Sequence, residues 1–178
     1  MNEFLDVLGK ELFNGLPDWQ RVVRVVVRLL FAVVLGGVVG YERQSEGKSA
    51  GARTHMIVAL GAALFTLIPL EAGLSTGDLT RVIQGVATGV GFLGAGIIYK
   101  TADQREVKGL TSAASIWLTA AVGTTVGAGW IWPAAIGVAF AWVILGTLHT
   151  FERWWHRHQG KGKNGRSGSG PPADGGTG

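Results

Sequence analysis

The chain has 178 residues, enough for one domain of ordinary size. Hydrophobic residues make up 47% of it, charged residues only 16%, and 29 positions are glycine. No Asp, Glu, Lys or Arg lies between Lys108 and Glu152, and a soluble surface cannot be built from such a stretch. The composition therefore argues against a soluble domain and favours a polytopic membrane protein. The absence of cysteine excludes disulfides and thiolate metal sites.

The first residues, 1–16, predict an interfacial segment. Apolar residues recur there at three-to-four-residue spacing, which favours an amphipathic helix over about 3–14 lying on a membrane surface. A frayed terminus is the alternative. Glu3, Asp6 and Glu11 give this segment the wrong charge for the start of a cleaved signal peptide, so we expect no cleavage.

Five apolar segments of helix length follow within residues 17–152. They cover about 22–40, 54–70, 82–99, 110–128 and 130–150. Continuous apolar runs argue against a β-barrel, whose strands alternate apolar and polar residues. We therefore predict an all-α fold, a compact bundle of five transmembrane helices. The remaining residues, 153–178, are expected to form a basic and then disordered cytoplasmic tail.

The loops alternate between rich and poor in lysine and arginine. The loop after the first span and the loop after the third are basic, whereas the loop after the second carries only Arg81. The positive-inside rule then places the N-terminus outside and the C-terminus in the cytoplasm. Arg21, Arg24 and Arg28 speak against this orientation. Arg28 lies deepest in the first span, so we expect it to need a carboxylate or phosphate partner.

The stretch TGVGFLGAG contains Gly89, Gly91 and Gly94 at the G-x-G-x-x-G spacing of dinucleotide-binding turns. That site needs a preceding strand and an acidic residue about twenty positions on, and this chain has neither. Small residues at four-residue spacing instead let two membrane helices approach closely. The glycines expected to pack helices together are Gly36, Gly40, Gly85, Gly89, Gly91, Gly94, Gly96, Gly123 and Gly127.

Two spans also carry polar stripes. Their members are Arg81, Gln84 and Thr88 in the third, and Ser112, Ser115 and Thr119 in the fourth. Polar groups at this spacing share one face of a helix and should face protein or water. Hydrogen bonds between helices and a lined cavity explain the stripes equally well.

The densest polar cluster is GYERQSEGKSAGARTH, residues 40–55. Glu42 lies in the last turn of one predicted helix, and Arg53, Thr54 and His55 lie in the first turn of the next. These side chains can meet across the helical hairpin. Such a set could clamp a phosphate, a carboxylate or another helix end.

Five blocks of sequence follow one another in the chain. They are G-Y-E-R-x4-K-x-A-G-x-R-T-H from Gly40, ALGAALFTL from Ala59, D-x2-R-V-x-Q from Asp78, GVGFLGAGII from Gly89, and V-K-G-L-T-S-A-A-S-I-W from Val107. In this order they resemble the MgtC/SapB family of bacterial inner-membrane proteins. The resemblance spans residues 36 to about 129. Leu79 and Ala52 depart from the family, where proline and leucine are common. Longer members also add a cytoplasmic domain after the fifth helix.

The resemblance implies a five-helix protein of the bacterial plasma membrane that is linked to growth in low magnesium. Some members are thought to restrain the membrane part of the F-type ATP synthase. The positions of interest carried over from the family pattern are Glu42, Arg43, Lys48, Arg53, Thr54, His55, Asp78, Arg81, Gln84, Lys108 and Thr111. We expect a role in which helices contact a larger membrane complex. The alternative is a small magnesium or proton channel or carrier lined by the two polar stripes.

Catalysis is the weakest hypothesis, because the chain has no nucleophile, base and acid in a plausible arrangement. We expect no enzyme activity, no cofactor and no metal site. The lipid bilayer is the predicted surroundings, a homodimer is a further expectation, and nucleic acid is not expected as a partner.

Overall fold

The computed structural model describes residues 2–13, 18–100 and 107–160, and within them the fold is all-α, as predicted. Its helices are α1 (Asn2–Phe13), α2 (Trp19–Ser45), α3 (Ala52–Glu71), α4 (Thr76–Ile97), α5 (Leu110–Gly127) and α6 (Ile131–Gly160). The chain divides into two compact parts at residue 142, and every site discussed below lies in the first part.

Three of these helices, α2, α3 and α5, are long and apolar enough to cross a membrane. In α6, residues 131–146 form a shorter apolar stretch. Helix α4 is 22 residues long but is not one of these three, because Arg81, Gln84 and several glycines lower its mean hydropathy. The protein is thus an all-α membrane protein. The number of five spans stays a prediction, as does the interfacial position of α1.

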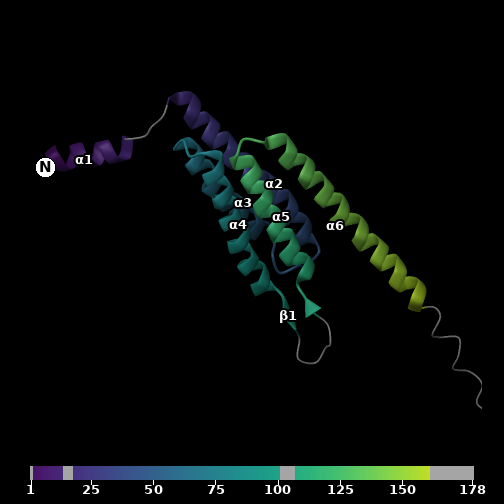
Figure 1. The fold of residues 1–178 in the computed structure, drawn as a ribbon. Coiled ribbons are helices and arrows are strands. Elements are labelled where there is room, and N and C mark those ends of the chain that lie inside the picture. Colours follow the sequence, from purple (N-terminus) through teal and green to yellow (C-terminus); the bar gives the residue numbers. More distant parts are fainter. Residues whose placement is uncertain (1, 14–17, 101–106, 161–178) are drawn as a thin grey trace, which may run out of the picture. The chain divides into compact units, whose positions relative to one another are not determined.

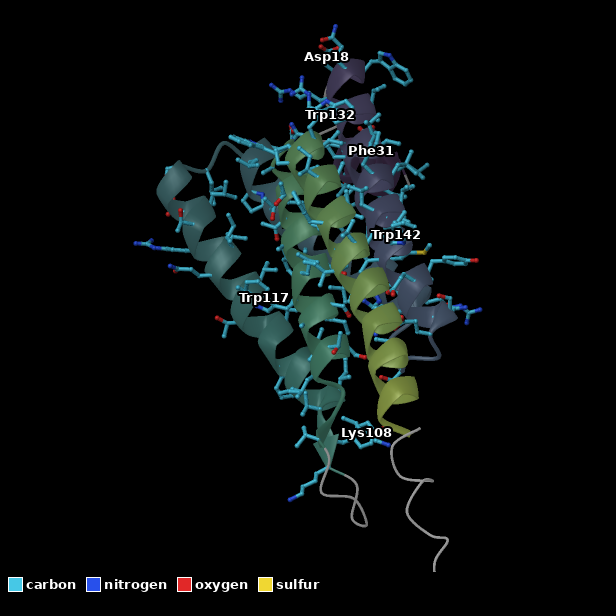
Figure 2. The ribbon with its side chains drawn as sticks, turned by 90° about the vertical axis from the view of Figure 1, so that its right-hand side faces the viewer. Asp18, Phe31, Lys108, Trp117, Trp132 and Trp142 are labelled. Atoms are coloured by element: carbon cyan, nitrogen blue, oxygen red, sulfur yellow. The ribbon has the colours of Figure 1, made fainter. Side chains whose placement is uncertain are left out.

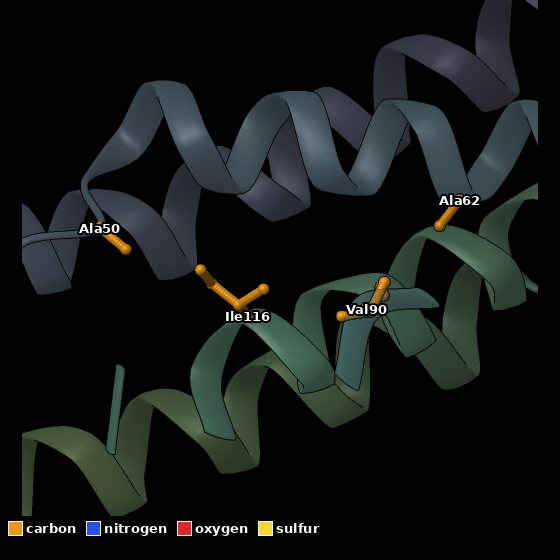
Figure 3. Packing of buried hydrophobic residues seen from close by; sticks show 5 residues of the cluster. Ala50, Ala62, Val90 and Ile116 are labelled. Carbon is orange, nitrogen blue, oxygen red and sulfur yellow. The ribbon is translucent and has the colours of Figure 1, made fainter. Parts of the chain in front are cut away.

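Helix α3 lies between α2 and α5 and packs against both, while α4 packs mainly against α5 (Figure 1). Ala50, Ala62, Val90, Ile116 and Ala120 form a buried apolar cluster that joins α3, α4 and α5 (Figure 3). Small side chains dominate this core. The helix backbones therefore approach closely, as is typical of packing in lipid.

Glycine lets α2 and α5 approach α3 from two sides. A Cβ atom at Gly36 of α2 would lie 2.8 Å from the Cβ atom of Ala59, and one at Gly123 of α5 would collide with the Ala59 carbonyl oxygen. Gly40 and Gly127 lie equally close to α3. These four of the predicted glycines thus lie where only a hydrogen atom fits.

The glycines of α4 differ from that expectation. Among the described residues, no atom lies within 4 Å of a Cβ atom built at Gly85, Gly89, Gly91 or Gly96. Of the predicted α4 glycines, only Gly94 makes a contact, and a Cβ atom there would lie 3.5 Å from the Cβ atom of Ala113. The reason is that α4 packs through its other face, with Val86, Val90 and Ile97 on the apolar cluster. TGVGFLGAG is therefore not a continuous packing surface within this chain.

Two further differences concern the segments between and after the spans. Strands β1 (Tyr99–Lys100) and β2 (Val107–Lys108) pair antiparallel, with Tyr99 opposite Lys108, so a short hairpin stands where we expected a loop. Helix α6 continues to Gly160, past the expected end at residue 150, so the first residues of the predicted tail are helical. Residues 161–178 lie outside the described part.

Helices α2, α3, α4 and α5 alternate in direction, so the α2–α3 loop and the β1–β2 hairpin lie at the same end of the bundle. Figure 2 shows Asp18, at the start of α2, and Lys108, in the hairpin, at opposite ends. The start of α4 belongs to the Asp18 end. Ser75 caps it there, because its hydroxyl oxygen accepts a hydrogen bond from the Asp78 amide at 3.3 Å.

Candidate functional site

A buried ionic cluster of Glu42, Arg43 and Glu46 lies at the hairpin end of the bundle. Arg43 donates from Nη1 to the Glu42 carboxylate at 3.3 Å, and its Nη2 lies 3.1 Å from the Glu46 carboxylate. The side chain of Arg43 is only 3% exposed, that of Glu42 10% and that of Glu46 13%. Charges so deeply buried are held only when each finds a partner of opposite sign.

The cluster leaves one polar atom unsatisfied. Arg43 Nε is buried and has no hydrogen-bond partner among the described residues. Burial raises the pKa of the Glu42 carboxyl above its usual range, and the neighbouring Glu46 adds to this shift while the Arg43 guanidinium opposes it. Two carboxyls thus share one guanidinium, and burial favours the neutral form of Glu42.

His55 forms a second polar link beside this cluster, between α3 and α5. Its side chain is 0% exposed. Nδ1 lies 3.0 Å from the carbonyl oxygen of Gly51, and Nε2 lies 3.2 Å from the hydroxyl of Ser115. Because a carbonyl can only accept, Nδ1 carries a hydrogen, and Nε2 of a neutral ring is then an acceptor. The single hydrogen of the Ser115 hydroxyl is shared between this nitrogen and the Ser112 carbonyl, to which the hydroxyl donates at 2.9 Å.

Ser115 and its neighbours on α5 are satisfied within the protein. The Ser115 hydroxyl also lies 2.9 Å from the Ser112 carbonyl, and Thr119 donates to the Ser115 carbonyl at 2.8 Å. All three side chains of the predicted stripe are buried. The stripe serves as an internal hydrogen-bonding face and lines no described cavity.

The predicted clamp across the hairpin does not form. Arg53 and Thr54 are exposed, and neither makes a hydrogen bond or ion pair with Glu42. Arg43, the neighbour of Glu42 in the chain, is the residue that pairs with it. The physical reason is helix geometry, because Arg53 and Thr54 project from the outer face of α3 while His55 points into the bundle.

The other family-pattern residues do not join the cluster. Lys48, Lys108 and Thr111 are exposed at the hairpin end. Asp78 and Arg81 lie at the opposite end, where they form a surface ion pair of 3.5 Å, and Gln84 is exposed one turn further along α4. The structure thus divides the sequence-predicted set between the two ends of the bundle.

Glu46 and Gln44 make contacts at this site but were missing from the family-pattern set, whereas Ser115 was predicted as part of a polar stripe. Glu46 follows Arg43 by three residues, a spacing that places both on one helical face and could have revealed the pair. Gln44 accepts a hydrogen bond from the Ala52 amide at 3.2 Å and so caps α3. No sequence signal indicates that contact.

Arg28 finds a partner different from the one expected. Its Nη1 donates to the carbonyl oxygen of Gly127 at 3.1 Å, so a backbone carbonyl replaces the predicted carboxylate or phosphate. The last carbonyls of α5 have no partner within their own helix and carry a partial negative charge. Arg28 therefore caps the C-terminal end of α5 from α2.

The polar contacts at the hairpin end hold helices together and do not form a recognisable catalytic or metal-binding arrangement among the described residues. No three histidine, cysteine or acidic side chains of the described residues cluster in a way that could hold a metal. Ser115 and His55 have no acidic third member, and both are shut off from solvent. What the site can do is fix α2, α3 and α5 to one another at the hairpin end.

Comparison with known proteins connects this bundle to a family. Residues 29–154 match the MgtC family. The chain is 43% identical to the protein SrpB of Synechococcus elongatus, over 80% of this chain and 81% of that protein. It is 43% identical to the protein MgtC of Brucella abortus, over 68% of this chain and 50% of that protein.

A third relative is the Escherichia coli protein named "Putative magnesium transporter YhiD". The identity is 37%, and the match covers 70% of this chain and 60% of YhiD. The chain thus spans only part of these two longer relatives. No solved structure matches it.

Proposed function

Because the chain belongs to the MgtC family, we propose that it is a membrane protein of magnesium homeostasis that acts through helix contacts with a larger membrane complex. The names of its relatives MgtC and YhiD support the link to magnesium. The F-type ATP synthase is the candidate complex that the family resemblance suggests. No enzyme activity is part of the proposal.

One observation carries the proposed mode of action: the polar face of α4 points outward. Arg81 is 82% exposed, and Gln84 and Thr88 are exposed with it. Thr88 donates to the Gln84 carbonyl, but the Gln84 side-chain amide has no partner among the described residues. An amide facing lipid is costly, and a polar group on a neighbouring helix would remove that cost.

The polar face of α5 supports contact over transport. The hydroxyl groups of Ser115 and Thr119 are buried and engaged with His55 or with backbone carbonyls, so these two groups are not free to bind an ion in passage. A pathway would need polar groups free to replace the water around a magnesium ion. The outward face of α4 is the better candidate for function.

The proposal includes a location in the plasma membrane, with the N-terminus outside and the C-terminus in the cytoplasm. The basic loops support it, because Lys48, Arg53, Lys100 and Lys108 all lie at the hairpin end. This orientation puts the buried ionic cluster near the cytoplasmic surface and the polar face of α4 toward the outer half of the membrane.

A photo-crosslinking amino acid at position 84 tests the proposed contact in native membranes at low magnesium. We expect a crosslink to a subunit of one membrane complex, identified by mass spectrometry. The matched control is position 34, where the apolar Val34 is also exposed, on α2. Identical crosslinks from both positions, or lipid adducts alone, would contradict the proposal.

A carrier for magnesium or protons is the second candidate. The buried Glu42–Arg43–Glu46 cluster, in which two carboxyls share one guanidinium, is the observation that favours it. Purified protein in liposomes with an enclosed magnesium-sensitive or pH-sensitive dye gives the test. Flux that is lost in Glu42→Gln would support a carrier, and no flux under any imposed gradient would remove it.

A further inference from the structure

A groove of about 540 Å³ runs between α3 and α4. Its walls are apolar throughout, with Ile57, Gly61 and Phe65 on α3 and Val82, Gly89 and Leu93 on α4. Because α3 and α4 are antiparallel, Ile57 and Leu93 lie at the hairpin end of the groove. Phe65 and Val82 lie at the other end. The function proposed above makes no use of this groove.

Missing side chains make the groove. No described atom lies within 4 Å of a Cβ atom built at Gly61, Gly85 or Gly89, so both walls are hollow where these glycines face it. A groove without an occupant loses the dispersion contacts of its lining. In a membrane helix bundle, the surrounding hydrocarbon supplies an occupant at once.

The length of the groove fits one leaflet. From Ile57 to Phe65 is eight residues, or roughly 12 Å at the rise of an α-helix. Half of the hydrocarbon core is about 15 Å thick. An acyl chain that enters at the hairpin end therefore fills the groove without reaching the other leaflet.

The hairpin end of the groove is positively charged. Arg53 lies one helical turn before Ile57 in α3, is exposed, and has no hydrogen bond or ion pair with any described residue. Lys100 and Lys108 in the two strands lie at the same end. At the opposite end of the groove, the positive charge of Arg81 is offset by Asp78, with which it pairs.

We propose that the groove between α3 and α4 holds an acyl chain of an anionic phospholipid, whose phosphate is bound by Arg53. A guanidinium group binds phosphate with two parallel hydrogen bonds. At the hairpin end of the groove, Arg53 is the basic side chain closest in sequence to the lining, whereas Arg81, next to Val82 at the other end, pairs with Asp78. The phosphate belongs to a lipid and not to free phosphate, because the apolar groove contributes the rest of the binding surface.

Two matched glycine variants test the groove. Gly89→Leu fills it, whereas Gly91→Leu places the same side chain on α4 outside the lining. Both should fold, since neither new Cβ atom meets a described atom within 4 Å. The full chain in nanodiscs of phosphatidylglycerol and phosphatidylethanolamine is released for native mass spectrometry. We expect Gly89→Leu to retain bound phospholipid about tenfold less than Gly91→Leu.

Arg53→Gln tests the headgroup. We expect this variant to keep a bound phospholipid but to lose the preference of the wild type for phosphatidylglycerol over phosphatidylethanolamine. Arg53→Lys should restore part of the preference because it restores the charge. Lys48→Gln is the control, since it removes an exposed positive charge from the neighbouring loop and should leave the preference unchanged.

Three outcomes would overturn the proposal. One is equal lipid retention by Gly89→Leu and Gly91→Leu. Another is an unchanged headgroup preference in Arg53→Gln. The third is a wild-type dimer that becomes monomeric in Gly89→Leu without any bound phospholipid, which would assign the groove to a second copy of the chain.

Discussion

His55 of α3 and Ser115 of α5 meet 3.2 Å apart inside the bundle, sixty positions apart in the chain. The same imidazole contacts the Gly51 carbonyl at the start of α3. A single buried ring therefore fixes the α2–α3 turn to α5. The stability of the hairpin end should depend on this pair more than on the basic residues around it.

Ser115→Ala removes the partner of His55 Nε2. A buried nitrogen left without a hydrogen bond costs about 1–3 kcal/mol, so we expect a loss of that size in the free energy of unfolding. Unfolding by SDS in mixed micelles, followed by circular dichroism, gives the measurement. Thr125→Ala is the control, because the Thr125 hydroxyl bonds only within its own helix. Equal losses in the two variants would refute the role of the pair.

Arg43→Met strips the counter-charge from Glu42 and Glu46. Removing one partner of a buried ion pair costs about 3–5 kcal/mol, so this variant should be destabilised strongly or fail to fold. Adding Glu42→Gln and Glu46→Gln removes the uncompensated charges and should recover much of the loss. The same SDS titration compares the wild type, the Arg43→Met variant and the triple variant. Lys48→Met, at an exposed position, should behave like the wild type.

Gly123→Ala forces a methyl group against the backbone of α3. Overpacking of this kind typically costs about 1–3 kcal/mol. Gly91→Ala meets open space and should be neutral or gain up to about 1 kcal/mol, because alanine favours a helix over glycine. Should Gly91→Ala prove the more harmful change, the assignment of the close contacts would be wrong.

Arg28→Met removes the donor that caps α5. We expect a loss of about 1–2 kcal/mol, since the Gly127 carbonyl is left without its charged partner. Arg24→Met deletes an exposed arginine of the same helix, one turn earlier, and should change stability by less than about 0.5 kcal/mol. Thermal unfolding in detergent separates the two cases.

The helices could be predicted from the sequence because their signal is local. Runs of apolar residues of membrane-spanning length place α2, α3 and α5 within a few residues of their observed bounds. The contacts of Gly36, Gly40, Gly123 and Gly127 likewise follow from small-residue spacing. The extension of α6 to Gly160 and the β1–β2 hairpin have no comparable signal in the residues.

The site was predictable only in part. Residue spacing shows which side chains share one face of a helix, but it does not show whether that face points into the bundle or away from it. The α4 glycines have the same pattern as those of α2, yet Gly85 and Gly89 face an open groove beside α3 instead of a closely packed backbone. The residues Arg53, Thr54 and His55 are consecutive, and only the last points inward. Which of them enters the core depends on how α3 is rotated between α2 and α5.

Ala59 is held between Gly36 on one side and Gly123 on the other. If α3 slid by one turn along either neighbour, a side chain would stand where only hydrogen fits, so the register of α2, α3 and α5 is locked. A shift of one of these three helices along another would therefore bring backbone and side-chain atoms into collision. Helix α4 has open space beside Gly85, Gly89 and Gly91 and a groove at its side, so a shift of α4 would meet fewer collisions of this kind.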